Sequence, residues 1–187
     1  RGRLGMRFEA MQVDGAWLIH LQRAGDARGW FARTWCREAF AAHGIDDAFV
    51  QCNVSFTARR GTLRGMHWQA PPHAEAKLVR CDRGAVYDCI IDLRPSSPTY
   101  LRWQAVELSA DNPRQLYVPE GFAHGFQTLT DEALMHYQMS RAYEPGAKRG
   151  LRHDDPAFAI DWPIADPRLS DADRAWPDFQ PRVAMRE

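Results

Sequence analysis

The sequence predicts an all-β protein of the sandwich or barrel type. Between residues 49 and 143 it is a succession of short stretches rich in apolar, aromatic and β-branched residues, with almost no helical periodicity. Clusters of Pro, Gly, Asp, Asn and Ser separate these stretches. Many short strands punctuated in this way are typical of a sandwich or a barrel.

Five stretches have the length and composition of strands. We predict strands over residues 76–81, 85–93, 103–108, 115–118 and 133–140. Turn-forming residues stand between them, at residues 82–84, 94–98, 110–113 and 119–121.

Helices are few. Residues 35–42 fit one short helix, and residues 171–175 fit another that begins behind Ser170, a residue type that caps helix N-termini. From Pro145 onward the chain is rich in Pro, Asp and Trp, and we expect it to cover the barrel as ordered loops. No repeat, low-complexity tract or flexible linker divides the chain, so we predict one domain over residues 1–187. Residues 1–5 precede Met6 and are left out of the fold prediction as an expression remnant or an extension.

The composition is that of an ordinary globular protein and excludes several classes of partner. Hydrophobic residues make up 45% of the 187 and charged residues 26%, which is enough apolar surface for one core. Twenty-four basic residues balance 24 acidic ones, so no bulk charge favours nucleic acid or an anionic membrane. No apolar run approaches the roughly 20 residues of a membrane helix and no signal peptide is visible, so we expect a cytoplasmic protein.

The four cysteines are Cys36, Cys52, Cys81 and Cys89, and no two of them form a Cys-x-x-Cys pair. A chain of this length closes a core without disulfides. We therefore expect reduced thiols with mostly structural roles.

The densest polar cluster is Gly-Thr-Leu-Arg-Gly-Met-His-Trp-Gln at residues 61–69, followed by Lys77. Charged groups inside strands are costly unless they face a partner or a cavity, so the cluster is a candidate site. The alternative is a hydrogen-bonded core histidine at His67 and an edge-strand lysine at Lys77. Arg64 and His67 differ in strand parity, so both can face one ligand only if the strand is bulged, which Gly65 would permit.

A second cluster, residues 119–126, places His124 just after a Pro-x-Gly turn, which matches the second cupin motif. Cupins that bind a metal usually take two histidines from a His-x-His in the first motif, but here that motif reads His-Trp-Gln at residues 67–69. A site of two histidines and a carboxylate could still form from His67, His124 and Glu75. Because the second histidine of the pair is missing, we expect no metal.

Seven segments resemble the dTDP-4-dehydrorhamnose 3,5-epimerase family. They follow one another in the same order and at the same spacing as in that family, and they extend over nearly the whole chain. They are residues 25–31, 49–55, 63–69, 77–80, 88–94, 116–126 and 169–173. The resemblance implies a cupin-like jelly-roll β-barrel with a few short helices. It also implies a homodimer that works without metal or cofactor on a nucleotide-sugar substrate.

Matched position by position, the resemblance assigns roles to ten side chains. Four are catalytic: His67 as base, Asp173 as its acidic partner, Tyr137 as acid and Lys77 as the cation near the keto oxygen of the substrate. Six bind the substrate: Arg28, Gln51, Asn53 and Arg64 at the nucleotide diphosphate, and Asp88 and His124 at the sugar.

The implied reaction is epimerisation at C3 and C5 of a nucleotide-diphosphate 4-keto-6-deoxyhexose, most simply in dTDP-L-rhamnose synthesis. Inverting a carbon beside a carbonyl requires removing a proton from one face and returning one to the other, so two groups on opposite faces are needed. Inversion at C3 alone or at C5 alone uses the same groups and stays open. From other classes, a metal-dependent cupin oxygenase and a non-catalytic sugar-binding cupin are the alternatives.

Several positions allow a structural explanation or depart from the family. Asp173 also fits a helix capping box, Tyr137 an ordinary strand aromatic and Arg28 a solvated turn arginine. Arg33 stands where the family usually carries a glutamate that helps hold the nucleotide, and Ala142 where relatives often have an aromatic residue. Another base or another keto sugar is therefore possible.

Overall fold

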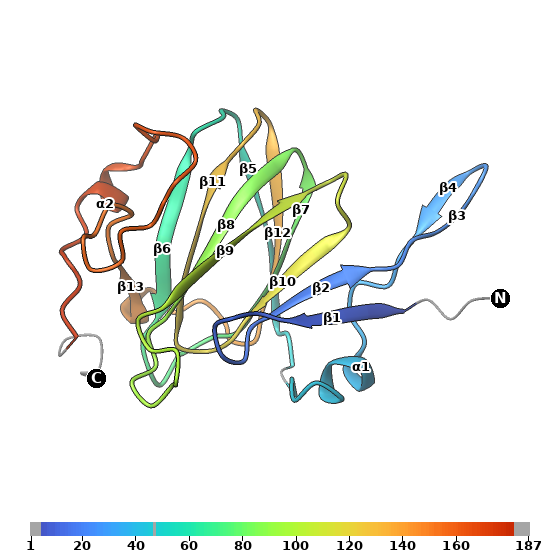
Figure 1. Cartoon of the computed structure of the whole chain (residues 1–187), viewed down its shortest axis with the longest axis horizontal. Coiled ribbons are helices and arrows are strands. Elements are labelled where there is room, and N and C mark those ends of the chain that lie inside the picture. The colour runs from blue at the N-terminus through green and yellow to red at the C-terminus, as the bar shows by residue number, and fades with distance from the viewer. Residues whose placement is uncertain (1–4, 47, 182–187) are drawn as a thin grey trace.

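The protein folds as two antiparallel β-sheets that pack face to face (Figure 1). The computed structural model describes residues 5–46 and 48–181, so residues 1–4 of the five set aside above lie outside the described part. Within those ranges one sheet contains, in spatial order, β1 (Met6–Ala10), β2 (Trp17–Leu21), β10 (Arg114–Val118), β7 (Lys77–Arg83), β12 (Ala133–Met139) and β5 (Gln51–Thr57). The other contains β13 (Lys148–Gly150), β6 (Leu63–Gln69), β11 (Phe122–Thr128), β8 (Ala85–Asp92) and β9 (Trp103–Ser109). The expected all-β, cupin-like jelly roll is confirmed.

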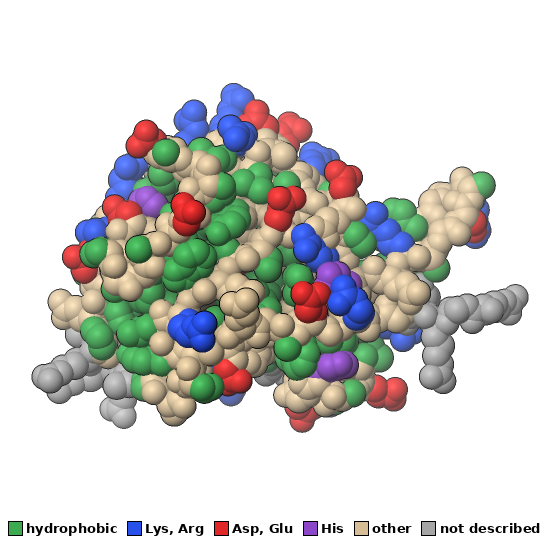
Figure 2. Space-filling view, in the orientation of Figure 1, with side chains coloured by type: hydrophobic (Ala, Val, Ile, Leu, Met, Phe, Trp, Pro, Cys, Tyr) green, Lys and Arg blue, Asp and Glu red, His purple; other side chains and the backbone are tan. Residues whose placement is uncertain are grey.

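Two smaller features complete the fold. Strands β3 (Ala24–Asp26) and β4 (Gly29–Phe31) form a hairpin that stands away from the two sheets (Figures 1 and 2). The helices are short: α1 (Arg37–Ala41), the 3₁₀ turn η1 (Pro145–Ala147) and α2 (Asp171–Arg174).

The five predicted strands are all present, as β7 to β10 and β12, with ends that differ from the prediction by at most two residues. Both predicted helices are present and shorter than expected. Helix α1 begins only at Arg37 because Cys36 is extended, with φ of −157°, and gives no side-chain cap. Helix α2 has the predicted Ser170 cap, whose hydroxyl accepts a hydrogen bond from the backbone N–H of Asp173.

Strand alternation decides which side chains enter the barrel, because successive strand residues point to opposite faces. On β8, Val86 and Ile90 belong to the core between the sheets, whereas Cys89 and Ile91 pack on the outer side. Asp88 shares the inner face with Val86 and Ile90. The same alternation that builds the core therefore places a carboxyl group inside it.

Helix α1 and the C-terminal segment cover the outer faces of the sheets. Phe40 of α1 packs with Ile19 outside the six-stranded sheet. Beyond Pro145 the chain crosses the outer face of the other sheet, where Leu151 and Phe158 are buried. Burial of such a side chain contributes about 1.5–3 kcal/mol. The predicted covering role of this segment is confirmed, although it also supplies β13 and α2.

All four cysteines are free thiols, and Cys81 and Cys89 are buried. Burial raises the pKa of the Cys81 thiol to about 11, so this group stays protonated at neutral pH. In the described part of the chain, no helix is long and apolar enough to span a membrane.

The predicted irregularity in β6 is present and has a steric cause. The pairing of β6 with β11 changes register between His124 and Phe126, opposite the stretch from Arg64 to His67. Gly65 has φ of +133°, and a Cβ there would lie 2.5 Å from the Cα of Gly125. Only glycine fits this close approach. The bulge lets Arg64 and His67 line the same cavity, as expected.

Replacing Gly65 by Ala should lower the free energy of unfolding by at least about 3 kcal/mol, because strain in φ adds to a collision with backbone. Gly44→Ala is the matched control, since Gly44 also has positive φ (+75°) but a Cβ at that position would meet no atom within 4 Å. It should cost only about 1 kcal/mol. Urea denaturation of both variants measures the difference, and equal losses would contradict the steric account.

Candidate active site

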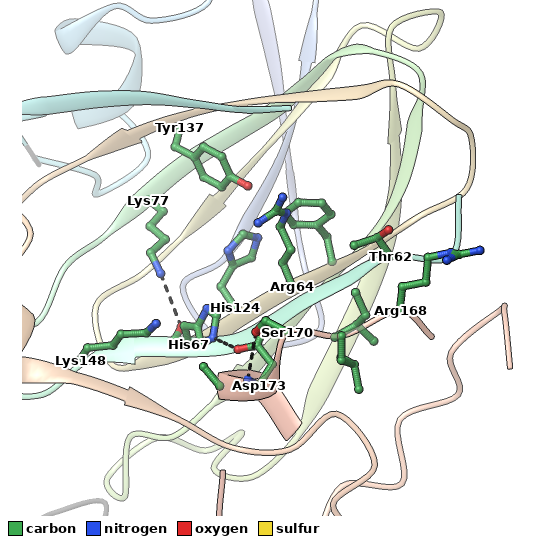
Figure 3. Close-up of a pocket in the computed structure, with 14 residues that line it drawn as sticks. Thr62, Arg64, His67, Lys77, His124, Tyr137, Lys148, Arg168, Ser170 and Asp173 are labelled. Atoms are coloured by element: carbon green, nitrogen blue, oxygen red, sulfur yellow. Dashed lines mark hydrogen bonds and ion pairs between the residues drawn. The ribbon is translucent and has the colours of Figure 1, made fainter. Parts of the chain in front are cut away.

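A cavity of about 560 Å³ opens between the two sheets (Figure 3). Strands β6, β11 and β13 supply one wall, and β7 and β12 the other. Residues 168–170 and the first turn of helix α2 close one side. Its charged and polar lining residues are Thr62, Arg64, His67, Lys77, His124, Tyr137, Lys148, Arg168, Ser170 and Asp173.

His67 and Asp173 form a hydrogen-bonded pair at the cavity wall. The distance from His67 Nε2 to Asp173 Oδ1 is 2.6 Å, and 8% of the Asp173 side chain is exposed against 28% of His67. The carboxylate thus fixes the orientation of the ring and leaves the other ring nitrogen free of that bond. The pair joins strand β6 to helix α2, more than one hundred residues apart in sequence.

Asp173 makes two separate interactions: its backbone N–H takes part in the helix cap, and its side chain binds His67. Its N–H is held by the Ser170 cap at 3.1 Å, while its carboxylate reaches across to His67. Burial raises the pKa of Asp173, but the hydrogen bonds from His67 and its other neighbours outweigh that effect, so the pKa lies below its ordinary value. Asp173 therefore takes part both in the helix cap and in a pair with His67, and its catalytic role stays a prediction.

His124 and Asp88 form a second pair, deeper in the barrel. His124 Nε2 lies 2.9 and 3.1 Å from the two carboxylate oxygens of Asp88. His124 is 5% exposed and Asp88 is fully buried, so Asp88 lies behind the histidine and only His124 reaches the cavity surface. A buried charge of this kind is tolerated because its partner is close.

Lys77 projects into the cavity from β7 and is paired with a carboxylate. Its Nζ lies 3.2 Å from Oε1 of Glu75, with both side chains about one tenth exposed. Glu75 is held in turn by the buried Gln69, whose Nε2 donates to Oε2 at 3.1 Å. The lysine is thereby fixed in position on the wall that also carries Tyr137.

Tyr137 lies on β12, across the cavity from His67 on β6 (Figure 3). Its ring meets that of His124 edge to face, with centroids 6.3 Å apart. Burial raises the pKa of Tyr137 well above its ordinary value, and the Asp88 carboxylate adds to this effect, whereas Ser55 and Arg64 oppose it. The phenol therefore stays protonated at neutral pH and is available as an acid.

A second hollow of about 610 Å³ adjoins the first, because Lys77 and Tyr137 line both. Asn53 lines this hollow, together with Tyr143. Gln51 shares its strand face with Asn53, and its Oε1 accepts a hydrogen bond from the backbone N–H of Tyr143 at 3.0 Å. The structure thus brings Gln51 and Asn53 to the side of the site where an extended ligand would continue.

Arg28 is the one predicted site residue that lies away from the cavity of its own chain. It sits at the turn of the β3–β4 hairpin, 90% exposed, and pairs with Asp26. Arg33, just beyond the hairpin, is also exposed.

The prediction from sequence missed Lys148, Arg168 and Glu75. Lys148 reaches the cavity because β13 pairs with β6, and Arg168 because its backbone bridges to Thr62. Both are long-range contacts that no local periodicity signals. Glu75 was considered only as a metal ligand.

The candidate metal ligands are engaged in side-chain pairs instead of facing one another. Among the described residues, no three His, Cys, Asp or Glu side chains come together in the manner of a metal site. His67, His124 and Glu75 each bind another partner, namely Asp173, Asp88 and Lys77.

Comparison with known proteins agrees with this geometry. The family model described as dTDP-4-dehydrorhamnose 3,5-epimerase matches residues 10–181. A dTDP-4-dehydrorhamnose 3,5-epimerase of Sinorhizobium fredii is 42% identical over 175 residues, which cover 93% of this chain and 90% of that protein. The chain belongs to the dTDP-4-dehydrorhamnose 3,5-epimerase family.

Other relatives show the range of this epimerase family. A dTDP-4-dehydrorhamnose 3-epimerase of Streptomyces niveus is 39% identical over 170 residues, covering 90% of this chain and 82% of that protein. The crystal structure of the Bacillus anthracis dTDP-4-dehydrorhamnose 3,5-epimerase with TDP and PPi bound has a TM-score of 0.91 at 40% identity. It covers 94% of this chain and 100% of that one. The predicted family and enzyme class are confirmed, and the chain is an isomerase.

Replacing Asp173 by Asn should lower kcat/KM by about 10²–10⁴-fold, because the amide keeps the shape of the carboxylate but not the charge that stabilises a protonated histidine. The control is Ser170→Ala, which loses about 1 kcal/mol of helix capping but keeps the contact to His67. It should retain most activity. Equal losses of activity in the two variants would show that Asp173 acts only through the helix.

The same variant tests the pKa of Asp173. Because the folded-state pKa lies below the ordinary value, the ionised carboxylate contributes stability above about pH 4, and this is lost as the pH falls through the folded-state pKa. The difference in unfolding free energy between wild type and Asp173→Asn should therefore shrink on acidification below about pH 4. A difference that does not change with pH would contradict the pairing.

Proposed function

We propose that this enzyme epimerises a nucleotide-diphosphate 4-keto-6-deoxyhexose, most simply dTDP-4-dehydro-6-deoxyglucose at C3 and C5 in dTDP-L-rhamnose synthesis. The observation that carries the proposal is the placement of His67 and Tyr137 on opposite walls of one cavity, from opposite sheets. A sugar ring between them presents one face to each group. Inversion beside a carbonyl needs that arrangement, whereas binding alone does not.

In the proposed mechanism His67 removes the proton from the carbon next to the keto group. Asp173 stabilises the imidazolium that forms, because its carboxylate is already bonded to the ring at 2.6 Å. The electron pair moves onto the keto oxygen as an enolate, which Lys77 stabilises. Tyr137 then donates its proton to the carbon from the other face, and the configuration is inverted.

The binding roles follow the position of each side chain. His124, backed by Asp88, lies between the two proton-transfer groups and holds the sugar. Arg64, Gln51 and Asn53 hold the diphosphate. The nucleotide base is open, because Arg33 replaces the usual glutamate, and affinities for thymidine, uridine, cytidine and guanosine diphosphates would identify it.

Whether C3, C5 or both are inverted depends on how the ring turns in the pocket, since one base serves both carbons. The Streptomyces niveus relative bears the name of a 3-epimerase. Position-resolved deuterium uptake from heavy water decides this point. The cytoplasmic location expected from the sequence stays a prediction.

We also propose that two copies of the chain assemble as a homodimer. The β3–β4 hairpin exposes Trp30 and Phe31 at 60% and 64%, and the outer face of edge strand β5 exposes Val54 and Phe56 at 64% and 51%. Exposed apolar groups on an edge strand and on a free hairpin favour pairing with a second copy. Arg28 would then serve the diphosphate of the partner, since it does not reach its own cavity.

Two variants separate the base from the acid. His67→Ala should lose proton abstraction, so product formation and exchange of substrate hydrogen with deuterium should both fall by about 10²–10⁴-fold. Tyr137→Phe keeps the base, so deuterium should still enter the substrate while net inversion falls sharply. Nuclear magnetic resonance of the sugar in heavy water records both quantities.

Equal loss of exchange and inversion in Tyr137→Phe would show that Tyr137 positions the substrate or supports the enolate instead. Normal exchange in His67→Ala would show that another group is the base.

The dimer is tested by replacing Phe31 with Ser. Removing an exposed aromatic side chain leaves the fold of a free hairpin unaffected but weakens an interface that buries it, by about 1–3 kcal/mol. Light scattering at micromolar concentration should give a dimer for the wild type and a larger monomer fraction for the variant. A monomeric wild type would refute the assembly.

A further inference from the structure

The cavity holds more positive charge than its own carboxylates neutralise. His67, His124 and Lys77 are each matched to a carboxylate, namely Asp173, Asp88 and Glu75. Three cations line the cavity without a carboxylate partner in the described part of the chain: Arg64, Lys148 and Arg168. Arg64 bonds to the Thr57 hydroxyl at 3.1 Å, which leaves its charge uncompensated. The electrostatics of the site therefore favour an anionic ligand.

Lys148 is the uncompensated cation next to the base. On β13 it stands opposite Gln69, while Gly150 stands opposite His67, so strand alternation puts Lys148 on the face of His67. Both side chains flank one indole: the Trp176 ring lies 6.0 Å from Lys148 Nζ and 6.3 Å from the His67 ring. Figure 3 shows the amino group of Lys148 turned toward His67.

An ammonium in this place opposes the reaction unless it has a ligand. When His67 takes a proton it becomes positive, and a bare positive neighbour in a partly buried site disfavours that change. A bound anion between or beside Lys148 and His67 offsets this repulsion. The developing enolate already has Lys77, on the other wall of the cavity.

The diphosphate of the substrate is the permanent anion nearest to the reacting carbons. It is attached to C1 of the sugar, and C3 and C5 are each two bonds from C1 around the ring. When His67 contacts C3 or C5, the phosphate linked to the sugar therefore lies within about one ring width of His67.

We infer that Lys148 is a further substrate-binding residue, whose ammonium binds the phosphate attached to the sugar. The inference rests on the proposed function, because it takes the substrate to be a sugar diphosphate. It assigns to Lys148 a contact distinct from that of Arg64: Lys148 fixes the sugar end of the diphosphate relative to His67. The cation–π contact with Trp176 holds the long side chain in place before the substrate arrives.

The test measures binding without turnover. Lys148→Met keeps the apolar stem that packs on Trp176 and removes the charge. Dissociation constants for thymidine diphosphate and for inorganic pyrophosphate, measured by calorimetry, should rise about tenfold, while thymidine, which has no phosphate, should bind as before. Lys148→Arg should restore both affinities to within about threefold of the wild type.

Arg102→Met is the matched control. It removes one positive charge from an exposed turn outside the cavity and should leave all three affinities unchanged. If Lys148→Met does not fold, Lys148→Gln replaces it, since the amide is polar and neutral.

Unchanged affinity for both phosphate ligands in a folded Lys148→Met enzyme would overturn the inference. A fall in kcat with unchanged affinities would also overturn it, and would place Lys148 at the enolate. Either result leaves the proposed function intact as long as the wild type epimerises a nucleotide 4-keto sugar. Failure of the wild type to exchange or invert any such sugar would instead refute the proposed function.

Discussion

The close approach of strands β6 and β11 at Gly65 and Gly125 is the constraint on which the site depends. A Cβ on Gly125 would lie 2.6 Å from Met66 Sδ and 2.9 Å from the Arg64 carbonyl oxygen, so each strand needs a glycine where it meets the other. This contact fixes the bulge in β6. Without the bulge, alternation would send Arg64 and His67 to opposite faces. One backbone contact thus brings two side chains into the same cavity.

Pairing with carboxylates then fixes the positions of the side chains that line the cavity. Two histidines and one lysine are paired with three carboxylates in or beside the cavity, and each pair joins separate strands or a strand and a helix, except for Glu75 and Lys77. Removing such groups from water costs several kcal/mol per ion, so an unmatched arrangement would be strongly disfavoured. The pairs therefore contribute little net stability and much geometric definition, which is what proton transfer to a defined carbon requires.

How far the sequence predicts this structure depends on the range of the interactions. The strands followed from turn residues and composition, which are local, and the bulge from the parity of Arg64 and His67. The catalytic roles came from the family resemblance, because nothing local distinguishes Tyr137 from an ordinary strand aromatic. Lys148 and Arg168 escaped prediction, since only the pairing of β13 with β6 and the bridge from Arg168 to Thr62 bring them to the cavity.

A two-sheet barrel suits a reaction that needs different groups on two faces of one ring. On one wall, desolvation of the partly buried Tyr137 and the negative potential of Asp88 behind His124 raise the pKa of the phenol, so the group keeps its proton. On the other wall, 28% of the His67 side chain is exposed, and the bonded Asp173 carboxylate can stabilise a positive ring. The two walls thus carry groups of different kinds, a phenol kept protonated on one and an imidazole bonded to a carboxylate on the other. Because the difference arises from burial and fixed neighbours rather than from a bound group, the protein's own side chains can supply both proton transfers.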